Sequence, residues 1–257
     1  MKKINITITG ALGRMGRVLI KKISKNKKLK LLSLTDVKSG KIIDGVKIQK
    51  NNLEAFKKTD VIIDFSNPKA TIEILNYAKK LKKKVVIGTT GFTKKQDNII
   101  KNSSKKIAIF KSGNMSLGIN LLEYLVAILT KKITNNYRIA ITDNHHKRKI
   151  DYPSGTALML ANAVAKGKKK FLHSLVGNKY LNKNGKFQNN KINFFITRKG
   201  NTIGKHSVIY SNSAENIELK HTAFSRELFA EGALNAAFWL GKKNKGLFNM
   251  QDMFKLK

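Results

Sequence analysis

The sequence predicts an α/β fold in two parts: a doubly wound parallel sheet, followed by a second α+β domain built on a mixed or antiparallel sheet. In the first half, short apolar runs alternate with segments whose apolar residues recur at helical spacing, and the connections are short. That alternation is typical of a parallel sheet with helices on both faces. In the second half, three apolar runs follow one another without a helix between them, which favours antiparallel or mixed pairing.

Each element of the first half follows from its own pattern. Ile4, Ile6 and Ile8 alternate with polar residues and predict a first strand that ends at Gly10. Further strands are expected at residues 29–35, 61–65, 85–88 and 107–110. Apolar residues at helical spacing predict helices over residues 15–23, 72–79 and 96–103.

The second half begins with a strongly apolar helix over residues 117–129 and continues with a strand over 137–142. Ser154 is a suitable N-cap for a helix over 154–165. Residues 166–190 are polar and rich in Gly, Asn and Lys, so we expect a loop there. The remaining elements are strands at 194–197, 206–210 and 217–221 and a closing helix at 226–240, which stops at Gly241.

Composition excludes several classes of function. A chain of 257 residues, 41% of them apolar, is long enough to bury one large core or two smaller ones. Because there is no cysteine, there is no disulfide framework, thiolate metal site or thiol nucleophile. No apolar run is long enough to cross a bilayer, and no apolar leader follows Met1. We therefore expect a cytoplasmic protein with no membrane partner.

The net charge of +37 has two interpretations. A basic surface can bind nucleic acid through its phosphates, or lysine can replace other residues wherever it is tolerated. The lysines are scattered from Lys2 to Lys257, and no basic stretch is interleaved with aromatic residues. This scatter favours the second interpretation, so we expect no specific nucleic-acid partner. The charge should still cost stability through self-repulsion and attract acidic substrates.

A glycine-rich segment, Gly10-Ala11-Leu12-Gly13-Arg14-Met15-Gly16, lies between the first strand and the first helix. Glycines there permit a tight turn and a close approach to a pyrophosphate, and the helix N-terminus supplies N–H groups. Asp36 ends the second strand, twenty positions after Gly16, where an acid binds ribose hydroxyls. The segment predicts a Rossmann-type dinucleotide site. A carboxylate repels the 2′-phosphate of NADPH and so favours NADH, although Lys38 could offset that repulsion and leaves the choice open.

Two further loops are expected at the same edge of the sheet. The strings Gly88-Thr89-Thr90-Gly91-Phe92 and Ser112-Gly113-Asn114-Met115 follow the fourth and fifth strands. Ligands of parallel sheets bind beyond the carboxyl ends of the strands. Either loop alone is compatible with an ordinary turn, but together they predict the lining of a nicotinamide pocket.

The segment 143–156 carries the richest chemistry. The helix that opens at Pro153-Ser154-Gly155-Thr156 offers the N–H groups of its last two residues to a substrate carboxylate. Lys149 and a nearby histidine, His145 or His146, can hold a second carboxylate and supply a proton. A solvated basic run and a metal site are the alternatives. Metal binding is the weaker one, because no further His or Cys has suitable spacing. We therefore expect a small dicarboxylate substrate and no metal.

Together these strings resemble the dihydrodipicolinate reductase (4-hydroxy-tetrahydrodipicolinate reductase) family over nearly the full length. The string His-His-x-x-Lys-x-Asp-x-Pro-Ser-Gly-Thr-Ala at 145–157 is the most specific match. The other matches are Gly10–Gly16, Asp64-Phe65-Ser66 with Pro68, Gly88–Phe92, Asn114–Asn120, Arg198, Gly200, Gly204, His206, Ser225-Arg226, Phe229-Ala230 and Gly232-Ala233.

The resemblance implies an activity and an organisation. It implies NAD(P)H-dependent reduction of 4-hydroxy-tetrahydrodipicolinate to tetrahydrodipicolinate, in diaminopimelate and lysine biosynthesis, by a homotetramer. Residues 1–116 together with 226–257 would form the dinucleotide-binding domain. Residues 117–225 would form the domain for substrate binding and oligomerisation.

Carried over by position, the functional residues of the family fall on the segments described above. His145 resembles the proton donor and acceptor, and Lys149 resembles a second proton donor. The implied substrate contacts are His146, Lys149, Ser154, Gly155 and Thr156. The implied cofactor contacts are Gly10, Ala11, Leu12, Gly13, Arg14, Met15, Asp36, Gly88, Thr89, Thr90, Ser112, Gly113, Asn114 and Met115. Asp143 and Asp36 stand where the family usually has glutamate, which keeps the charge but shortens the reach.

Two other functions remain open on the sequence. A different Rossmann-type oxidoreductase, acting on a small acidic or sugar-like substrate, would share the first half but would not account for the helix start at 153–156. A non-enzymatic basic binding protein would retain affinity for DNA at physiological salt and would oxidise no coenzyme.

Overall fold

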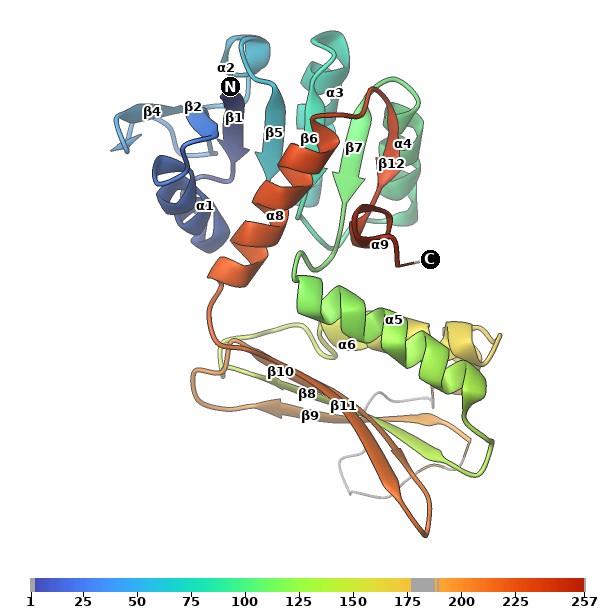
Figure 1. Cartoon of the computed structure of the whole chain (residues 1–257). Helices are drawn as coiled ribbons and strands as arrows, with labels where there is room; N and C mark the ends of the chain where they lie inside the picture. Colours follow the sequence, from blue (N-terminus) through green and yellow to red (C-terminus); the bar gives the residue numbers. More distant parts are fainter. Residues whose placement is uncertain (1–2, 177–187, 189, 257) are drawn as a thin grey trace. The chain divides into compact units, whose positions relative to one another are not determined.

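The computed structural model describes residues 3–176, 188 and 190–256, and it divides into two compact units (Figure 1). The first unit comprises Met1–Ser116 and Arg226–Lys257, and the second comprises Leu117–Ser225. The chain therefore returns to the first unit after completing the second. Among the described residues, no helix is both long enough and apolar enough to span a membrane.

The first unit is built on a twisted sheet whose strand order is β12-β7-β6-β5-β1-β2-β4-β3. All neighbouring strands in it are parallel except β3 and β4, which pair antiparallel. The strands are β1 (Ile4–Thr9), β2 (Leu29–Thr35), β3 (Ile42–Ile43), β4 (Val46–Gln49), β5 (Val61–Asp64), β6 (Lys84–Ile87), β7 (Ala108–Lys111) and β12 (Gly246–Phe248).

Helices cover both faces of this sheet (Figure 1). They are α1 (Arg14–Ser24), α2 (Leu53–Lys57), α3 (Pro68–Lys80), α4 (Lys94–Ser104), α8 (Glu227–Leu240) and α9 (Met250–Phe254). Successive side chains of a strand point to opposite faces, and the two apolar cores follow that rule. Val61 and Ile63 of β5 pack in the core that contains α1 and α8. Ile62 packs in the core that contains α2, α3 and α4.

Local capping explains where several of these helices begin. Asn67 accepts a hydrogen bond from the N–H of Ala70, and Pro68 occupies the first turn of α3, where its missing N–H costs nothing. Thr93 and Gln96 form a reciprocal capping box at the start of α4. These signals lie within a few residues of the helix start, so they act independently of the rest of the fold.

The second unit places two helices against a four-stranded sheet of order β11-β10-β8-β9. Strand β10 pairs antiparallel with β8 and β11, whereas β8 and β9 pair parallel. The elements are α5 (Leu117–Lys132), β8 (Arg138–His145), α6 (Gly155–Gly167), α7 (Leu172–Leu175), β9 (Ile192–Arg198), β10 (Gly204–Ser211) and β11 (Asn216–Ala223). Tyr210 anchors the core. Burial raises its pKa to about 12, although its hydroxyl shares a hydrogen bond with Thr130.

The structure confirms the predicted fold class, a parallel sheet with a separate mixed sheet, and adds short elements that the sequence pattern missed. The additions β3, β4, α2, β12 and α9 have two to five residues each, too few to show a period. The stretch 166–190, expected as a loop, contains the short helix α7, so that expectation was wrong there. Residues 177–187 and 189 of that stretch lie outside the described part.

Candidate active site

The predicted site residues fall into two groups, one in each unit. In the first unit, Gly10, Leu12, Gly13 and Asp36 line one cavity of about 250 Å³ at the carboxyl ends of β1, β2 and β5. Its other lining residues, which were not among the predicted cofactor contacts, are Thr9, Val37, Asn51, Phe65, Ser66, Asn67 and Ala70. The remaining predicted cofactor contacts do not line it: Ala11, Arg14, Met15, Gly88, Thr89, Thr90, Ser112, Gly113, Asn114 and Met115.

Two glycines in the first loop have no room for a side chain. Gly10 has φ +72°, and a Cβ built on it would lie 2.3 Å from the carbonyl oxygen of Phe65. A Cβ on Gly16 would lie 2.3 Å from the carbonyl oxygen of Gly10. The loop therefore packs tightly between the end of β5 and the first turn of α1, which is the arrangement that a dinucleotide loop needs.

Asp36 closes the loop from the neighbouring strand. Its Oδ2 accepts a hydrogen bond of 2.9 Å from the N–H of Leu12, and its Oδ1 accepts one of 2.8 Å from the N–H of Val37. The carboxylate is thus fixed at the rim of the cavity with both oxygens engaged by backbone.

Asp64 is a buried carboxyl group to which the sequence pattern assigned no role. It ends β5, is fully buried, and accepts hydrogen bonds from the hydroxyls of Thr9, Ser66, Thr71 and Thr89. Burial raises the pKa of Asp64, against the effect of these four donors. The four donors come from β1, α3 and two loops. Their hydrogen bonds to Asp64 therefore connect the segments that surround the cavity.

The other two predicted loops lie where strands β6 and β7 end. The hydroxyl of Thr89 accepts from the N–H of Ser66, which links the loop after β6 to the cavity wall. The N–H of Ser112 donates to the carbonyl of Ile87, and its hydroxyl donates to the carbonyl of Asn114. Met115 is buried, so its side chain contributes to the core rather than to an open surface.

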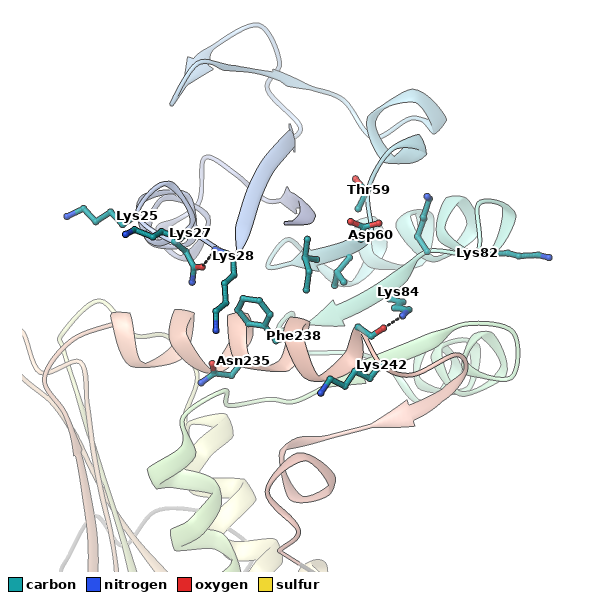
Figure 2. Close-up of a pocket in the computed structure, with 15 residues that line it drawn as sticks. Lys25, Lys27, Lys28, Thr59, Asp60, Lys82, Lys84, Asn235, Phe238 and Lys242 are labelled. Carbon is teal, nitrogen blue, oxygen red and sulfur yellow. Dashed lines mark hydrogen bonds between the residues drawn. The ribbon is translucent and has the colours of Figure 1, made fainter. Parts of the chain in front are cut away.

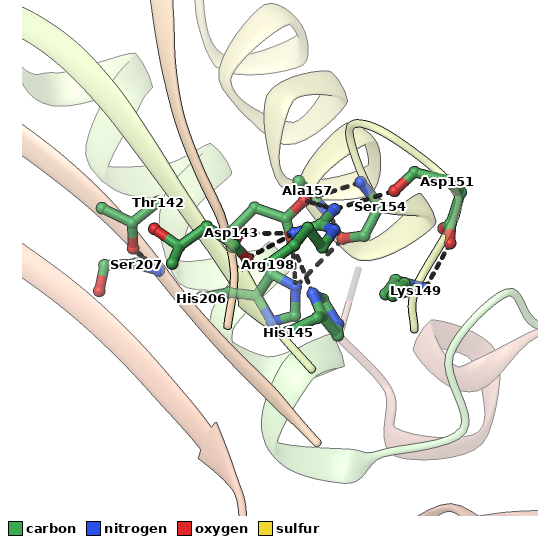
Figure 3. A network of polar contacts seen from close by, with 11 residues as sticks. Thr142, Asp143, His145, Lys149, Asp151, Ser154, Ala157, Arg198, His206 and Ser207 are labelled. Carbon is green, nitrogen blue, oxygen red and sulfur yellow. Dashed lines mark hydrogen bonds and ion pairs between the residues drawn. The ribbon is translucent and has the colours of Figure 1, made fainter. Parts of the chain in front are cut away.

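The second group surrounds Asp143 in the second unit (Figure 3). Asp143 and His145 are two residues apart on β8 and so share one face of the sheet. Strand register brings His206 of β10 opposite Asp143, and Arg198 of β9 opposite His145. The sheet therefore assembles a carboxylate, two imidazoles and a guanidinium from three strands.

The contacts of Asp143 divide between its two oxygens. Oδ1 lies 2.9 Å from Nδ1 of His145 and 3.1 Å from Nε2 of His206. Oδ2 lies 2.9 Å from Nη2 of Arg198 and accepts a hydrogen bond of 2.8 Å from the N–H of Ser154. The rings of the two histidines pack edge to face, with centroids 4.9 Å apart.

These contacts set the charges of the group. Burial acts to raise the pKa of Asp143, but the contacts from His145, His206, Arg198 and Ser154 outweigh it and hold that pKa well below its usual range. Burial lowers the pKa of His206, against the effect of Asp143. Asp143 is accordingly a carboxylate, and His206 is neutral at neutral pH.

The start of α6 lies beside this network. Ser154 is the N-cap, as the sequence predicted, and its hydroxyl accepts from the N–H of Ala157. The same hydroxyl lies 3.2 Å from Nε2 of His206. Gly155 is exposed, and a Cβ built on it would have no neighbour within 4 Å.

Lys149 pairs with a carboxylate of its own loop. Its Nζ lies 2.7 Å from Oδ1 of Asp151. Burial acts to raise the pKa of Asp151, and Lys149 and the backbone N–H of Gly155 hold it below its usual value. His146 is buried, and its backbone N–H donates to the carbonyl of Thr202 at 2.7 Å. The predicted substrate contacts thus lie within one loop and the first turn of α6.

Arg198 and His206 are part of this network but were not assigned a role from the sequence, although both belong to the matching strings. Arg198 also donates to the carbonyls of Asp143 and Asp151 and stacks over the ring of Tyr152. No local signal points to this role, because their place beside Asp143 depends on strand pairing, which cannot be derived from spacing alone.

The ligand atoms of Asp143, His145 and His206 lie within 4.8 Å of one another, close enough to hold a metal ion. Asp143 and His145 lie on β8, but His206 comes from β10, far along the sequence, so residue spacing gave no sign of the cluster. Arg198 already neutralises the same carboxylate, and a cation bound there would be repelled by the guanidinium. The residues therefore fit an ion-paired acid–base network better than a metal centre.

A larger cavity, of about 1230 Å³, lies at the opposite edge of the first sheet, near the amino ends of β1, β5 and β6 (Figure 2). Seven lysines line it: Lys25, Lys27, Lys28, Lys82, Lys83, Lys84 and Lys242. Several follow the C-terminal ends of α1, α3 and α8, where cations complement the helix dipole. None of the predicted site residues belongs to this cavity.

Comparison with known proteins gives matches over nearly the full length. The family model for the N-terminus of dihydrodipicolinate reductase matches residues 4–115, and the model for its C-terminus matches residues 118–254. The 4-hydroxy-tetrahydrodipicolinate reductase of Pelagibacter ubique is 52% identical over 98% of both chains. That of Buchnera aphidicola subsp. Cinara cedri is 45% identical, over 98% of this chain and 97% of the relative.

Solved structures show the same fold. A dipicolinate-bound dihydrodipicolinate reductase from Paenisporosarcina sp. TG-14 gives a TM-score of 0.78 at 21% identity, over 97% of this chain and 98% of that one. The DAP dehydrogenase of C. glutamicum in complex with DAP gives a TM-score of 0.58 at 11% identity, over 100% of this chain and 96% of that one. At these identities the likeness concerns the fold.

Proposed function

Because the chain belongs to the dihydrodipicolinate reductase family, we propose that it reduces 4-hydroxy-tetrahydrodipicolinate to tetrahydrodipicolinate with a nicotinamide cofactor. In this reaction the ring accepts one hydride, one proton is consumed, and the hydroxyl group leaves as water. The observation that carries the proposal is the loop 145–156, which gathers a buried imidazole, an ammonium group and a helix N-terminus. Those groups suit a small dicarboxylate that must also receive a proton.

The first unit fits a dinucleotide. The backbone of the glycine loop passes so close to Phe65 that a Cβ at Gly10 would clash with it, and the N-terminus of α1 follows directly. Asp36 stands at the rim of the same cavity. When bound, the cofactor supplies the hydride. The residues of this chain hold its phosphates by backbone N–H groups and its ribose by the carboxylate of Asp36.

We propose NADH as the preferred form. Asp36 presents negative charge where the 2′-phosphate of NADPH would lie, and its two oxygens are fixed by Leu12 and Val37. Lys38 is exposed beyond them. Comparing both coenzymes in one assay tests this assignment, and a higher kcat/KM with NADPH would contradict it.

The second unit supplies substrate binding and the proton. One carboxylate of the substrate binds at the N-terminus of α6, formed by Ser154, Gly155 and Thr156. Lys149 and His146 bind the other. His145 exchanges a proton with the ring, and Lys149 acts as a second proton donor. These groups come from the end of β8, the loop that follows it and the start of α6.

Substitution of the two proton donors tests the proposal. The purified chain, given freshly made substrate, should oxidise the coenzyme. His145→Gln and Lys149→Ala should each lower kcat by about 10²- to 10⁴-fold, the usual contribution of a general acid. His173→Gln and Lys132→Ala are matched controls, since both residues are exposed and lie outside the site. Normal turnover by either site variant would show that its role is wrong.

We further propose that the protein works in the cytoplasm as a homotetramer, in the biosynthesis of diaminopimelate and lysine. The family resemblance supports all three statements. Light scattering on the purified chain tests the assembly: a mass near 116 kDa, four times the 28.9 kDa of one chain, is expected, and a monomer would contradict it.

A further inference from the structure

Asp143 is placed to act on the proton donor rather than on the substrate. It is fully buried, and its two oxygens have different partners. Oδ2 is held by the guanidinium of Arg198 and the N–H of Ser154, whereas Oδ1 faces the two imidazoles. One oxygen therefore anchors the carboxylate, and the other is left for the histidines.

The anchoring side is rigid. Arg198 donates not only to Oδ2 of Asp143 but also to the carbonyls of Asp143, Thr197 and Asp151, and its guanidinium lies over the ring of Tyr152, 5.4 Å from the centroid. A guanidinium with this many fixed partners keeps the carboxylate both ionised and immobile.

The other side selects one nitrogen of His145. Nδ1 is buried and lies 2.9 Å from Oδ1 of Asp143. Nε2 points toward Gly204, where a built Cβ would come within 3.2 Å of it. A carboxylate beside Nδ1 favours the ring form that carries a proton there. Nε2 is then the atom that gives or takes a proton. The absence of a side chain at position 204 leaves space beside it.

His206 also contacts Asp143, but as a neutral ring it brings no positive charge to the carboxylate. Its ring lies edge to face against that of His145, and its Nε2 lies between Oδ1 of Asp143 and the hydroxyl of Ser154. It is held neutral by burial, as described above. A single positive charge, on His145, can therefore be accommodated by Oδ1 during turnover.

We propose that Asp143 is a positioning residue that holds His145 with its proton on Nδ1, so that Nε2 serves as the proton-transferring atom. This inference rests on the proposed reductase function. In a purely structural role, Asp143 would only tie Arg198 and the start of α6 to the sheet. It would then not determine which ring nitrogen of His145 carries the proton.

The first experiment separates charge from shape at position 143. Asp143→Asn should lower kcat on the order of 10²- to 10⁴-fold while changing KM for the coenzyme less than about 3-fold, because an amide cannot enforce the same ring form. Asp143→Glu keeps the charge and should recover kcat to within about 10-fold of the unsubstituted chain. Glu218→Gln, which removes an exposed carboxylate from the same sheet, is the control and should turn over normally.

The second experiment needs no folded variant at position 143. ¹⁵N NMR of the unsubstituted chain, with the His145 resonances assigned through His145→Gln, should show the proton of the neutral ring on Nδ1. A proton on Nε2 would overturn the proposal, and so would an Asp143→Asn protein that keeps its kcat. If the unsubstituted chain oxidises no coenzyme, the proposed function fails, whereas the NMR result still decides the position of the proton.

Discussion

At the scale of single residues, the carboxylate of Asp151 occupies groups of the candidate site that we assign to substrate binding. The ammonium of Lys149 lies 2.7 Å from Asp151, and the N–H of Gly155 acts on the same carboxylate. An ammonium and a helix N-terminus are also the groups that we assign to the carboxylates of the substrate. Asp151 therefore competes with the substrate for the same partners.

Removing this competitor should strengthen carboxylate binding. Asp151→Asn should lower the Kd for dipicolinate, used as a dicarboxylate probe, by about 2- to 5-fold, since a half-exposed ion pair contributes up to about 1 kcal/mol. Isothermal titration calorimetry measures this directly. Asp44→Asn is the control, because it removes an exposed carboxylate in the other unit at a left-handed position that asparagine tolerates. Weaker binding by Asp151→Asn would mean that Asp151 positions Lys149 instead.

At the scale of elements, the sequence predicted those helices and strands that local caps and hydrophobic periods determine. The start of α6 at Ser154 and the strand–helix alternation up to β7 follow from caps and periods within a few residues. Strand β12 and helix α9, after Gly241, have three and five residues, too few for either signal. The partners of Asp143 depend on strand register, which aligns His206 and Arg198 from 63 and 55 residues away. No local pattern sets that pairing, so their role was missed.

Asp64 connects β1, β5, α3 and the loop after β6. Its ionisation should therefore change the free energy of unfolding with pH. Burial raises its pKa above the usual 3.8, so the folded state binds this proton more tightly than the unfolded chain does. The resulting contribution to stability is fully present below the unfolded pKa and is lost as pH rises through the folded pKa.

The Asp64→Asn side chain does not titrate. The difference in unfolding free energy between the unsubstituted chain and this variant therefore measures the pH-dependent contribution of Asp64. As pH rises from 4 to 8, the free energy of unfolding of the unsubstituted chain should fall relative to that of Asp64→Asn, by at most about 1.4 kcal/mol per pH unit. Urea unfolding at each pH gives the difference. Thr71→Val keeps the carboxyl group but removes one donor, so it should destabilise more at pH 8 than at pH 4. A difference that is constant, or that grows with pH, would contradict the raised pKa.

Charge dominates at the scale of the whole chain. The sequence has 52 basic and 15 acidic residues, and the basic cavity in Figure 2 shows how densely lysines gather in one place, with Asp60 as its single acidic lining residue. Repulsion among these groups opposes the compact state, whereas the same field attracts anions such as the coenzyme and a dicarboxylate. The two effects have opposite consequences for function, and salt screens both.

Raising NaCl from about 0.02 M to 0.5 M should therefore move stability and catalysis in opposite directions, because the Debye length falls from roughly 20 Å to about 4 Å over that range. Tm should rise by several degrees as repulsion is screened, and kcat/KM should fall by about 10-fold as attraction of the anionic reactants is lost. The value of kcat should change little, since the contacts of Asp143 and His145 are buried. Thermal unfolding and steady-state kinetics in the same buffers measure all three, and KCl in place of NaCl controls for specific binding of the cation. A Tm that falls with salt would show that ion pairs, rather than repulsion among the lysines, dominate the electrostatics of the folded chain.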